Sequence, residues 1–197
     1  ATITLAVNSA RSFEVSFREG FCQVISILTC TGFSSADYIL WPMSSALIIF
    51  LMMFAGGCTG STSGGIKMAR HLIVIKNIKN VFVKLNHPKS ISFVRLNGKI
   101  ITENTNISVM SFVVLYLFLF IIGTIIVVLN GVDPVTASSS VASCMAAIGP
   151  GLGAVGPTGS FADIPGLSKV ILSLLMIIGR LEILTVFAIF TRTFWKL

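Results

Sequence analysis

A long uncharged stretch, residues 104–132, constrains the fold of this chain more than any other feature. It contains no Asp, Glu, Lys or Arg, and a stretch of this length can cross the roughly 30 Å of hydrocarbon in a bilayer. Its most apolar part, residues 107–129, predicts a membrane-spanning helix. Composition agrees, since 54% of the 197 residues are hydrophobic and 11% are charged. The sequence therefore predicts an integral membrane protein rather than a soluble domain.

The basic residues give the chain an orientation in the membrane. Eight of the fourteen Lys and Arg residues lie between Lys67 and Lys99, and no acidic residue occurs between Asp37 and Glu103. Loops rich in Lys and Arg stay on the cytoplasmic side, so this region is predicted to be cytoplasmic. Basic runs also occur in nucleic-acid-binding proteins, but a position between two membrane helices favours topology as the cause. We expect a lipid bilayer as the partner, and no nucleic acid.

The second half of the chain has the order long helix, short helix, irregular segment, long helix. Asp133 and Pro134 predict the start of the short helix. That helix, over residues 134–145, would be about 18 Å long and too short to cross a bilayer. Residues 146–157 contain four glycines and two prolines, which end the helix and return the chain outward. A last helix, predicted over 164–190, crosses to the cytoplasm.

The first half repeats this order in the same orientation. Residues 1–7 have the composition of the end of a spanning helix, and 16–28 that of a short apolar helix that stops at 29–33. Tyr38 and Trp41 are predicted to be interfacial aromatic residues in an outer turn. A long apolar segment then leads back to the cytoplasm. The sequence thus predicts an all-α membrane protein with two helix–pore loop–helix repeats, as in a P-loop cation channel subunit.

The short helices explain how such a unit would bind a cation. A helix whose C-terminal end points at the membrane centre puts partial negative charge there. Backbone carbonyls after each helix can replace the hydration shell of an ion, and glycine permits the angles that turn them inward. Neither segment has an acidic side chain, which argues against a carboxylate ring. The predicted carbonyl donors are Cys30, Thr31, Gly32 and Phe33 in one repeat and Ala147, Ile148, Gly149 and Pro150 in the other.

Two interruptions of apolar segments predict further functional residues. Glycine and hydroxyl residues take over at 56–65, and a helix broken at this depth must face a cavity or protein. A continuous helix packed through its GxxxG spacings is the alternative. Arg180 lies within an apolar segment, where a charge costs at least about 2.5 kcal/mol, so it should face water, an anion or the pore. The alternative is a structural charge neutralised by other helices. Glu182 points to a different side of the same helix.

Four ordered motifs carry a resemblance to a known family. They are Thr31-Gly32-Phe33, the stretch 56–65, Gly149-Pro150-Gly151-Leu152-Gly153, and Gly179-Arg180-Leu181-Glu182-Ile183 followed by Phe194-Trp195. In these motifs the chain resembles the Trk/Ktr/HKT superfamily of potassium transporters, and most closely the C-terminal half of the bacterial TrkH branch. One departure is Ala146-Ala147, where that branch often has asparagine. This departure concerns the side-chain support of the filter and not its carbonyls.

The resemblance implies half of a pseudo-fourfold pore, because the family links four repeats in one chain. Residues 1–80 would form the third repeat with its broken second helix, 81–103 a basic cytoplasmic linker, and 104–197 the fourth repeat. The first two repeats would be missing, so the chain is expected to be a fragment. Potassium ions would bind the carbonyls of Thr31, Gly32, Ile148 and Gly149.

The resemblance also implies a gate below the filter. The stretch 56–65 would form an intramembrane loop that obstructs the pore, with an arginine of the last helix beside it in the permeation path. Lys67 would anchor the cytoplasmic end of the loop. The gate residues implied in this way are Gly56, Gly57, Gly60, Ser61, Gly64, Gly65, Lys67 and Arg180.

The implied function is potassium uptake across the bacterial inner membrane by a multi-pass protein that is not an enzyme. The resemblance further implies homodimers of complete pores and a cytosolic nucleotide-binding regulatory ring of the TrkA type, with no organic cofactor on this chain. An alternative is a secondary, ion-coupled transporter with re-entrant hairpins, which parallel repeats disfavour. Another is a packing subunit without a pathway, which Arg180 and the two glycine segments disfavour. A GxGxxG match at 151–156 lacks the flanking strand and helix of a dinucleotide site.

Overall fold

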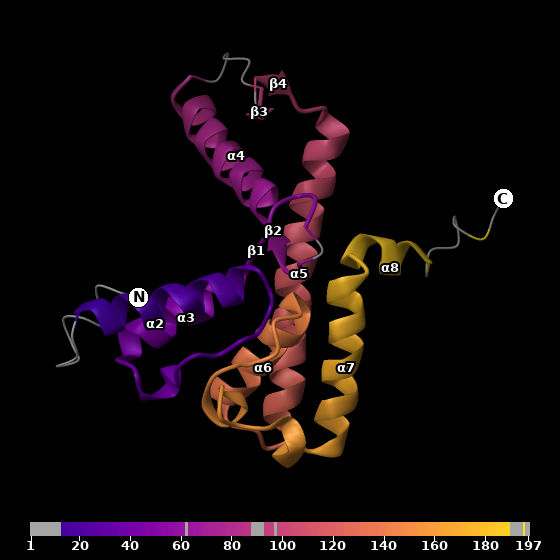
Figure 1. The fold of residues 1–197 in the computed structure, drawn as a ribbon. Helices are drawn as coiled ribbons and strands as arrows, with labels where there is room; N and C mark the ends of the chain where they lie inside the picture. The colour runs from indigo at the N-terminus through magenta and orange to yellow at the C-terminus, as the bar shows by residue number, and fades with distance from the viewer. Residues whose placement is uncertain (1–12, 62, 88–92, 97, 190–194, 196–197) are drawn as a thin grey trace.

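The computed structural model describes residues 13–61, 63–87, 93–96, 98–189 and 195 of the chain (Figure 1). The expectations for residues 1–7 and Phe194 therefore lie outside the described residues. The described part is mostly helical, with two short two-stranded ladders. Its elements are α2 (Phe13–Leu28), η1 (Tyr38–Leu40), α3 (Met43–Met52), β1 (Ala55–Gly56), β2 (Ile66–Lys67), α4 (Met68–Asn86), β3 (Arg95–Leu96), β4 (Lys99–Ile100), α5 (Glu103–Leu129), α6 (Pro134–Ala146), η2 (Gly153–Val155), η3 (Phe161–Asp163), α7 (Gly166–Arg180) and α8 (Ile183–Ile189).

Helix α5 is the predicted spanning helix and begins one turn earlier than the sequence indicated. It has 27 residues, and within the described ranges it is the one helix that by itself is long and apolar enough to cross a bilayer. Most of its side chains remain exposed, including Ile121 and Ile125, as expected for a surface that faces lipid or further protein. Its inward stripe, which includes Phe112, Tyr116 and Val127, belongs to the main hydrophobic core.

Helix α6 is short, buried and packed against both α5 and α7 (Figure 1). Its start is set by Asp133, whose carboxylate accepts hydrogen bonds from the backbone N–H groups of Val135 at 3.1 Å and Thr136 at 3.3 Å. Pro134 occupies the first helical position, where its missing N–H costs nothing. Small residues allow its neighbours to approach closely. A Cβ added at Gly179 of α7 would collide with the carbonyl oxygen of Met145.

The first repeat has the same order of elements as the second, a short helix followed by an irregular segment and another helix. Less of it lies within the described residues. Helices α2 and α3 lie side by side (Figure 1) and are joined by an irregular return segment that contains η1. The prediction that Tyr38 and Trp41 sit at the membrane interface is wrong, because their side chains are 0% and 6% exposed. The return segment folds inward, and both rings join a second core with Ile27, Ile49 and Ile148.

Both segments predicted to lead back to the cytoplasm are broken in the structure. Helix α3 ends at Met52, and β1 and β2 then form a parallel ladder that closes the loop between them. The prediction of one continuous last helix over 164–190 is wrong. Helix α7 ends at Arg180, and α8 departs at 103°. Glu182 at this bend has a φ of 61°, which a helix cannot continue through.

The basic linker is more regular than the sequence indicated. Helix α4 runs on through Asn86, so the boundary predicted at residue 80 falls inside it. A short antiparallel ladder, β3 with β4, then turns the chain back to α5. Helices α4 and α5 diverge toward this end (Figure 1) and are tied by a reciprocal amide pair. Asn77 donates to Asn106 at 2.6 Å, and Asn106 donates back at 3.1 Å.

Removing the cap of α6 should lower the stability of the second repeat. We expect Asp133→Ala to cost about 1 kcal/mol, because two N–H groups at the helix start lose their acceptor. The thermal denaturation midpoint of the full-length protein measures this loss. Asp163→Ala is the matched control, since this exposed acid does not cap a helix in the described part of the chain. Equal midpoints for both variants would contradict the capping role.

Candidate functional site

The two short helices end in the same backbone motif. After α2, the N–H of Cys30 donates to the carbonyl of Ile27 and that of Thr31 to Ser26, at 3.1 and 3.0 Å. After α6, the N–H of Ala147 donates to Cys144 and that of Ile148 to Ser143, at 3.2 and 3.0 Å. This pair of bonds is a Schellman motif, which satisfies the last carbonyls of a helix while turning the chain away. The two predicted filter segments therefore begin with equivalent geometry.

The backbone angles repeat as well. Cys30 and Gly32 have φ values of 53° and 71°, and Ala147 and Gly149 have 55° and 116°. Positive φ at every second residue is a conformation that glycine adopts readily and that other residues rarely adopt. Cys30 and Ala147 are not glycines, so each costs about 1–2 kcal/mol in this conformation. Such strain persists only where surrounding contacts impose it, and it is concentrated at functional sites.

The structure brings the two predicted filter segments together. A Cβ added at Gly32 would collide with the carbonyl oxygen of Ile148 and would lie 3.2 Å from Cδ of Pro150. The backbones of the two loops are therefore in direct contact at this point, where a side chain could not fit. Phe33, the last predicted donor of the first loop, turns its ring outward and is 81% exposed.

Buried polar side chains hold the return segments behind these loops. Gln23 of α2 donates to the carbonyl of Ala36 at 3.1 Å. The Ser139 hydroxyl of α6 accepts from the N–H of Leu152 at 2.9 Å and donates to its carbonyl at 3.1 Å. Ser143 accepts from the N–H of Gly149 at 3.1 Å. Sequence reasoning missed these residues, although a serine-rich helix in a membrane chain is a usable signal, because buried hydroxyls need partners.

Two side-chain hydrogen bonds join the return segment of one repeat to the other repeat. The phenol of Tyr38 donates to the carbonyl of Gly151 at 2.7 Å, and both groups are buried. Nearby, the Thr158 hydroxyl donates to the carboxylate of Asp37 at 3.2 Å at the surface. Neither contact was expected from the sequence, because the partners are more than 100 residues apart in the chain.

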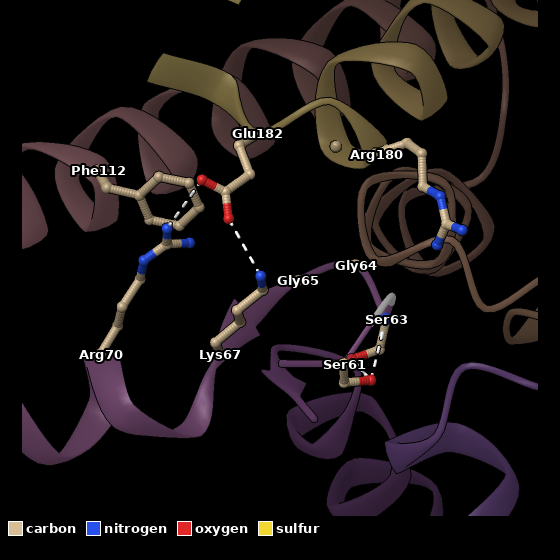
Figure 2. A pocket seen from close by; sticks show the side chains of 10 residues that line it. Ser61, Ser63, Gly64, Gly65, Lys67, Arg70, Phe112, Arg180 and Glu182 are labelled. Atoms are coloured by element: carbon tan, nitrogen blue, oxygen red, sulfur yellow. Dashed lines mark hydrogen bonds and ion pairs between the residues drawn. The ribbon is translucent and has the colours of Figure 1, made fainter. Parts of the chain in front are cut away.

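Below the loops, the structure contains a cavity of about 230 Å³ (Figure 2). Five of the eight predicted gate residues contribute to its wall, together with residues from α4, α5, the end of α7 and the bend between α7 and α8. The lining residues are Ser61, Ser63, Gly64, Gly65, Lys67, Arg70, Phe112, Gly179, Arg180 and Glu182. Three elements that are far apart in sequence therefore meet at one polar site.

The loop between β1 and β2 packs directly under the C-terminal end of α6. A Cβ added at Gly64 would lie 2.5 Å from the carbonyl oxygen of Ala146, and one added at Gly56 would lie 2.5 Å from the carbonyl oxygen of Gly64. Close packing of backbone on backbone explains the glycines at these two positions. Gly60 is not closely packed in this way, because a Cβ added there would meet nothing within 4 Å.

Serine hydroxyls fix the interior of this loop. The N–H of Gly57 donates to the Ser63 hydroxyl at 2.9 Å, and the Ser61 hydroxyl donates to the same oxygen at 3.0 Å. At the end of the loop next to α4, the ammonium group of Lys67 donates to the carbonyl of Thr59 at 3.2 Å. The loop is thus held by its own polar groups, although the helix hydrogen bonds are interrupted.

Glu182 connects the bend between α7 and α8 to the start of α4. Its carboxylate lies 3.1 Å from the ammonium group of Lys67 and 3.2 Å from the guanidinium group of Arg70 (Figure 2). Arg70 also stacks on the ring of Phe112, with its Cζ 3.8 Å from the ring centroid. Figure 2 shows the side chain of Arg180 extending away from this cluster. The two charges do not point the same way, but the prediction that they lie on different sides of one helix is wrong, because α7 ends at Arg180 and Glu182 lies at the bend. The sequence did not reveal the partners of Glu182.

Comparison with known proteins agrees with this architecture. A family model described as "TrkH: Cation transport protein" matches residues 7–196. The Trk system potassium uptake protein TrkH of Halomonas elongata is 36% identical over 195 residues, covering 99% of this chain and 40% of the relative. The corresponding protein TrkG of Escherichia coli K12 is 37% identical over 206 residues, covering 98% of this chain and 42% of the relative.

A solved structure gives the same result at the level of the fold. The crystal structure of the potassium transporter TrkH from Vibrio parahaemolyticus matches with a TM-score of 0.90 and 30% identity. The match covers 98% of this chain and 41% of that one, so the chain spans about 40% of the length of these relatives. The class that these comparisons define is that of the cation transport proteins. Within that class, the chain belongs to the TrkH family.

Neutralising Glu182 should loosen the loop between β1 and β2. Glu182→Gln removes the charge that Lys67 and Arg70 share, and partly exposed ion pairs of this kind contribute up to about 1 kcal/mol. We expect amide hydrogen exchange over residues 56–67 to become about twofold to fivefold faster in the full-length protein. Glu103→Gln, at the exposed start of α5, is the control. Unchanged exchange in both variants would show that the ion pairs do not hold the loop.

Proposed function

We propose that this chain forms two of the repeats of a potassium uptake pore in the bacterial inner membrane, as part of a multi-pass protein. The main support is the pair of loops after α2 and α6. Both loops begin with a Schellman motif and have positive φ at alternate residues, and their backbones are in contact with each other. The names of the relatives, potassium uptake proteins of the Trk system, support the choice of ion. Two further repeats would complete the ring around the ion.

The proposed filter binds potassium through backbone carbonyls of Thr31, Gly32, Ile148 and Gly149. Helices α2 and α6 both end beside the loops, so the partial negative charge of two helix C-termini falls near the ion. Carbonyl oxygens can replace the water around a dehydrated cation without contributing a net charge. In this scheme the side chains of Ser139 and Ser143 hold the loop from behind and leave the carbonyls of the filter free for the ion.

The proposed gate is the loop between β1 and β2, with Arg180 beside it. The loop lies below the end of α6 and borders the polar cavity, a position that would obstruct ions leaving the filter. Arg180 adds a positive charge to the same cavity, and a cation passing there would be repelled. Glu182 anchors the far end of the loop through Lys67.

We further propose that complete pores form homodimers and that a cytosolic nucleotide-binding ring of the TrkA type docks on the inner face. Helix α4 supports this docking, because it extends along the basic part of the chain with Lys79 and Lys84 exposed. Any regulatory nucleotide would then bind the ring, and this chain would need no organic cofactor.

Substituting the filter glycines tests the proposed function. Gly32→Ala and Gly149→Ala force a side chain into positive φ, at a cost of about 1–2 kcal/mol each, and Gly32→Ala also displaces Ile148. We expect rubidium uptake by the full-length protein, in a host that lacks potassium uptake, to fall about tenfold or more.

Gly131→Ala is the matched control for these variants. Gly131 has a φ of 87° in the turn after α5, and a Cβ there would meet nothing within 4 Å. A side chain at Gly131 therefore causes the same backbone strain as one at the filter glycines, but it lies outside the filter loops. We expect near-normal uptake. Absence of uptake by the wild-type protein, or normal uptake by both filter variants, would contradict the proposed function.

Pushing the loop away from α6 tests the proposed gate. Gly64→Ala adds a methyl group where the carbonyl of Ala146 now lies, so the loop must shift away from the filter. We expect uptake to rise relative to wild type at equal amounts of inserted protein. Gly166→Ala, at a position where a Cβ meets nothing within 4 Å, should leave uptake unchanged. Unchanged or lower uptake in normally inserted Gly64→Ala would count against the gate.

A further inference from the structure

The buried phenol of Tyr38 is the one hydrogen-bond donor in the described residues that reaches from the return segment of the first repeat into the backbone just after the second filter loop. Its hydroxyl lies 2.7 Å from the carbonyl oxygen of Gly151, and its side chain is 0% exposed. Trp41 packs edge-on against the ring, with centroids 6.2 Å apart. A side chain so enclosed has no alternative rotamer available, so the position of the hydroxyl is fixed by packing.

Gly151 is held on both sides of its Cα. Its N–H donates to the carbonyl of Val155 at 2.7 Å, and its own carbonyl accepts from Tyr38. Because the trans peptide is planar, an N–H fixed toward Val155 directs the carbonyl of Pro150 the opposite way. The next peptide plane is held from both ends, by the bond from Tyr38 to the carbonyl of Gly151 and by the bond from the N–H of Leu152 to Ser139. Together these bonds orient the carbonyls at the outer end of the second filter loop, and the bond from Tyr38 is the one that comes from the other repeat.

The segment that carries Tyr38 is itself anchored. Gln23 holds the carbonyl of Ala36, and the carboxylate of Asp37 accepts from the N–H of Ile39 at 3.0 Å and from the Thr158 hydroxyl at 3.2 Å. This turn lies outside the spanning helices. Burial, with a smaller contribution from Asp37, raises the pKa of Tyr38 above its ordinary value, so the phenol keeps its proton and remains a donor.

We propose that Tyr38 is a specificity-determining positioning residue, which couples the two filter loops and sets the spacing of the carbonyls that distinguish potassium from sodium. The inference rests on the proposed function. Sodium is the smaller ion and gains from oxygens that can move inward, whereas a filter with fixed peptide planes holds the spacing that suits potassium. If the carbonyl of Gly151 loses the hydrogen bond from Tyr38, the outer end of the loop relaxes. The discrimination of potassium from sodium then falls.

Tyr38→Phe tests this proposal, because it removes the hydroxyl and keeps the ring. The full-length variant is reconstituted in liposomes, and sodium and rubidium uptake are measured at equal amounts of inserted protein. We expect the sodium-to-rubidium uptake ratio to rise about threefold to tenfold, in proportion to the loss of one buried hydrogen bond. Rubidium uptake itself is expected to persist, since the loop backbone is intact.

Tyr116→Phe is the matched control. Tyr116 is 1% exposed in the core around α5, and its hydroxyl has no hydrogen-bond partner among the residues that the structure describes. Its removal costs a buried hydroxyl but no hydrogen bond to either loop, so the uptake ratio should equal that of wild type. An unchanged ratio in Tyr38→Phe, or the same change in both variants, overturns the proposal. Wild-type protein without rubidium uptake would instead overturn the proposed function.

A second series of variants tests the same proposal if Tyr38→Phe does not insert into the membrane. Ring-fluorinated tyrosines at position 38 keep the shape of the side chain and change the strength of the phenol as a donor. We expect the sodium-to-rubidium uptake ratio to fall as the donor strengthens, while the amount of inserted protein stays constant. A ratio that does not follow donor strength would show that the hydroxyl only fills space, and would overturn the proposal.

Discussion

The need to satisfy every backbone polar group inside a membrane governs this structure. Each helix that stops within the apolar part of the chain leaves carbonyls without partners, and here each such end is closed by a specific device. Schellman bonds close α2 and α6 at Cys30 and Ala147. Serine hydroxyls and a two-residue ladder close the gap between α3 and α4. The irregular segments are therefore ordered, and can hold carbonyls in fixed directions.

Small residues are the second requirement of this structure, because they let the hydrogen-bonded helix ends pack against one another. The carbonyls at the end of α6 lie against Gly64 of the loop and Gly179 of α7, with no room for a side chain at either position. Gly32 has the same relation to Ile148. Filter loop, cavity and bend are thus packed as one unit around the C-terminal end of α6, and a change in one of them displaces backbone in the others.

Much of this architecture could be predicted from the sequence, because hydropathy and helix-breaking residues are local signals. The uncharged stretch, the short helix after Asp133 and the glycine interruptions located α5, α6 and the irregular segments closely. Side-chain partners could not be predicted in this way. The contact of Tyr38 with Gly151 and the ion pairs of Glu182 join residues more than 100 positions apart. The bend at Glu182 was also missed, since the residues that make it, Leu181 and Glu182, are neither glycine nor proline.

The direct junction of β2 with α4 has a mechanical consequence. Lys67 ends the strand that closes the loop and is also the cap of a 19-residue helix, with no flexible turn between them. Such a helix is about 28 Å long. Because Glu182 binds both Lys67 and Arg70, the loop, the first turn of this helix and the bend between α7 and α8 are joined at one carboxylate. A displacement of the helix would therefore move the loop and the bend together.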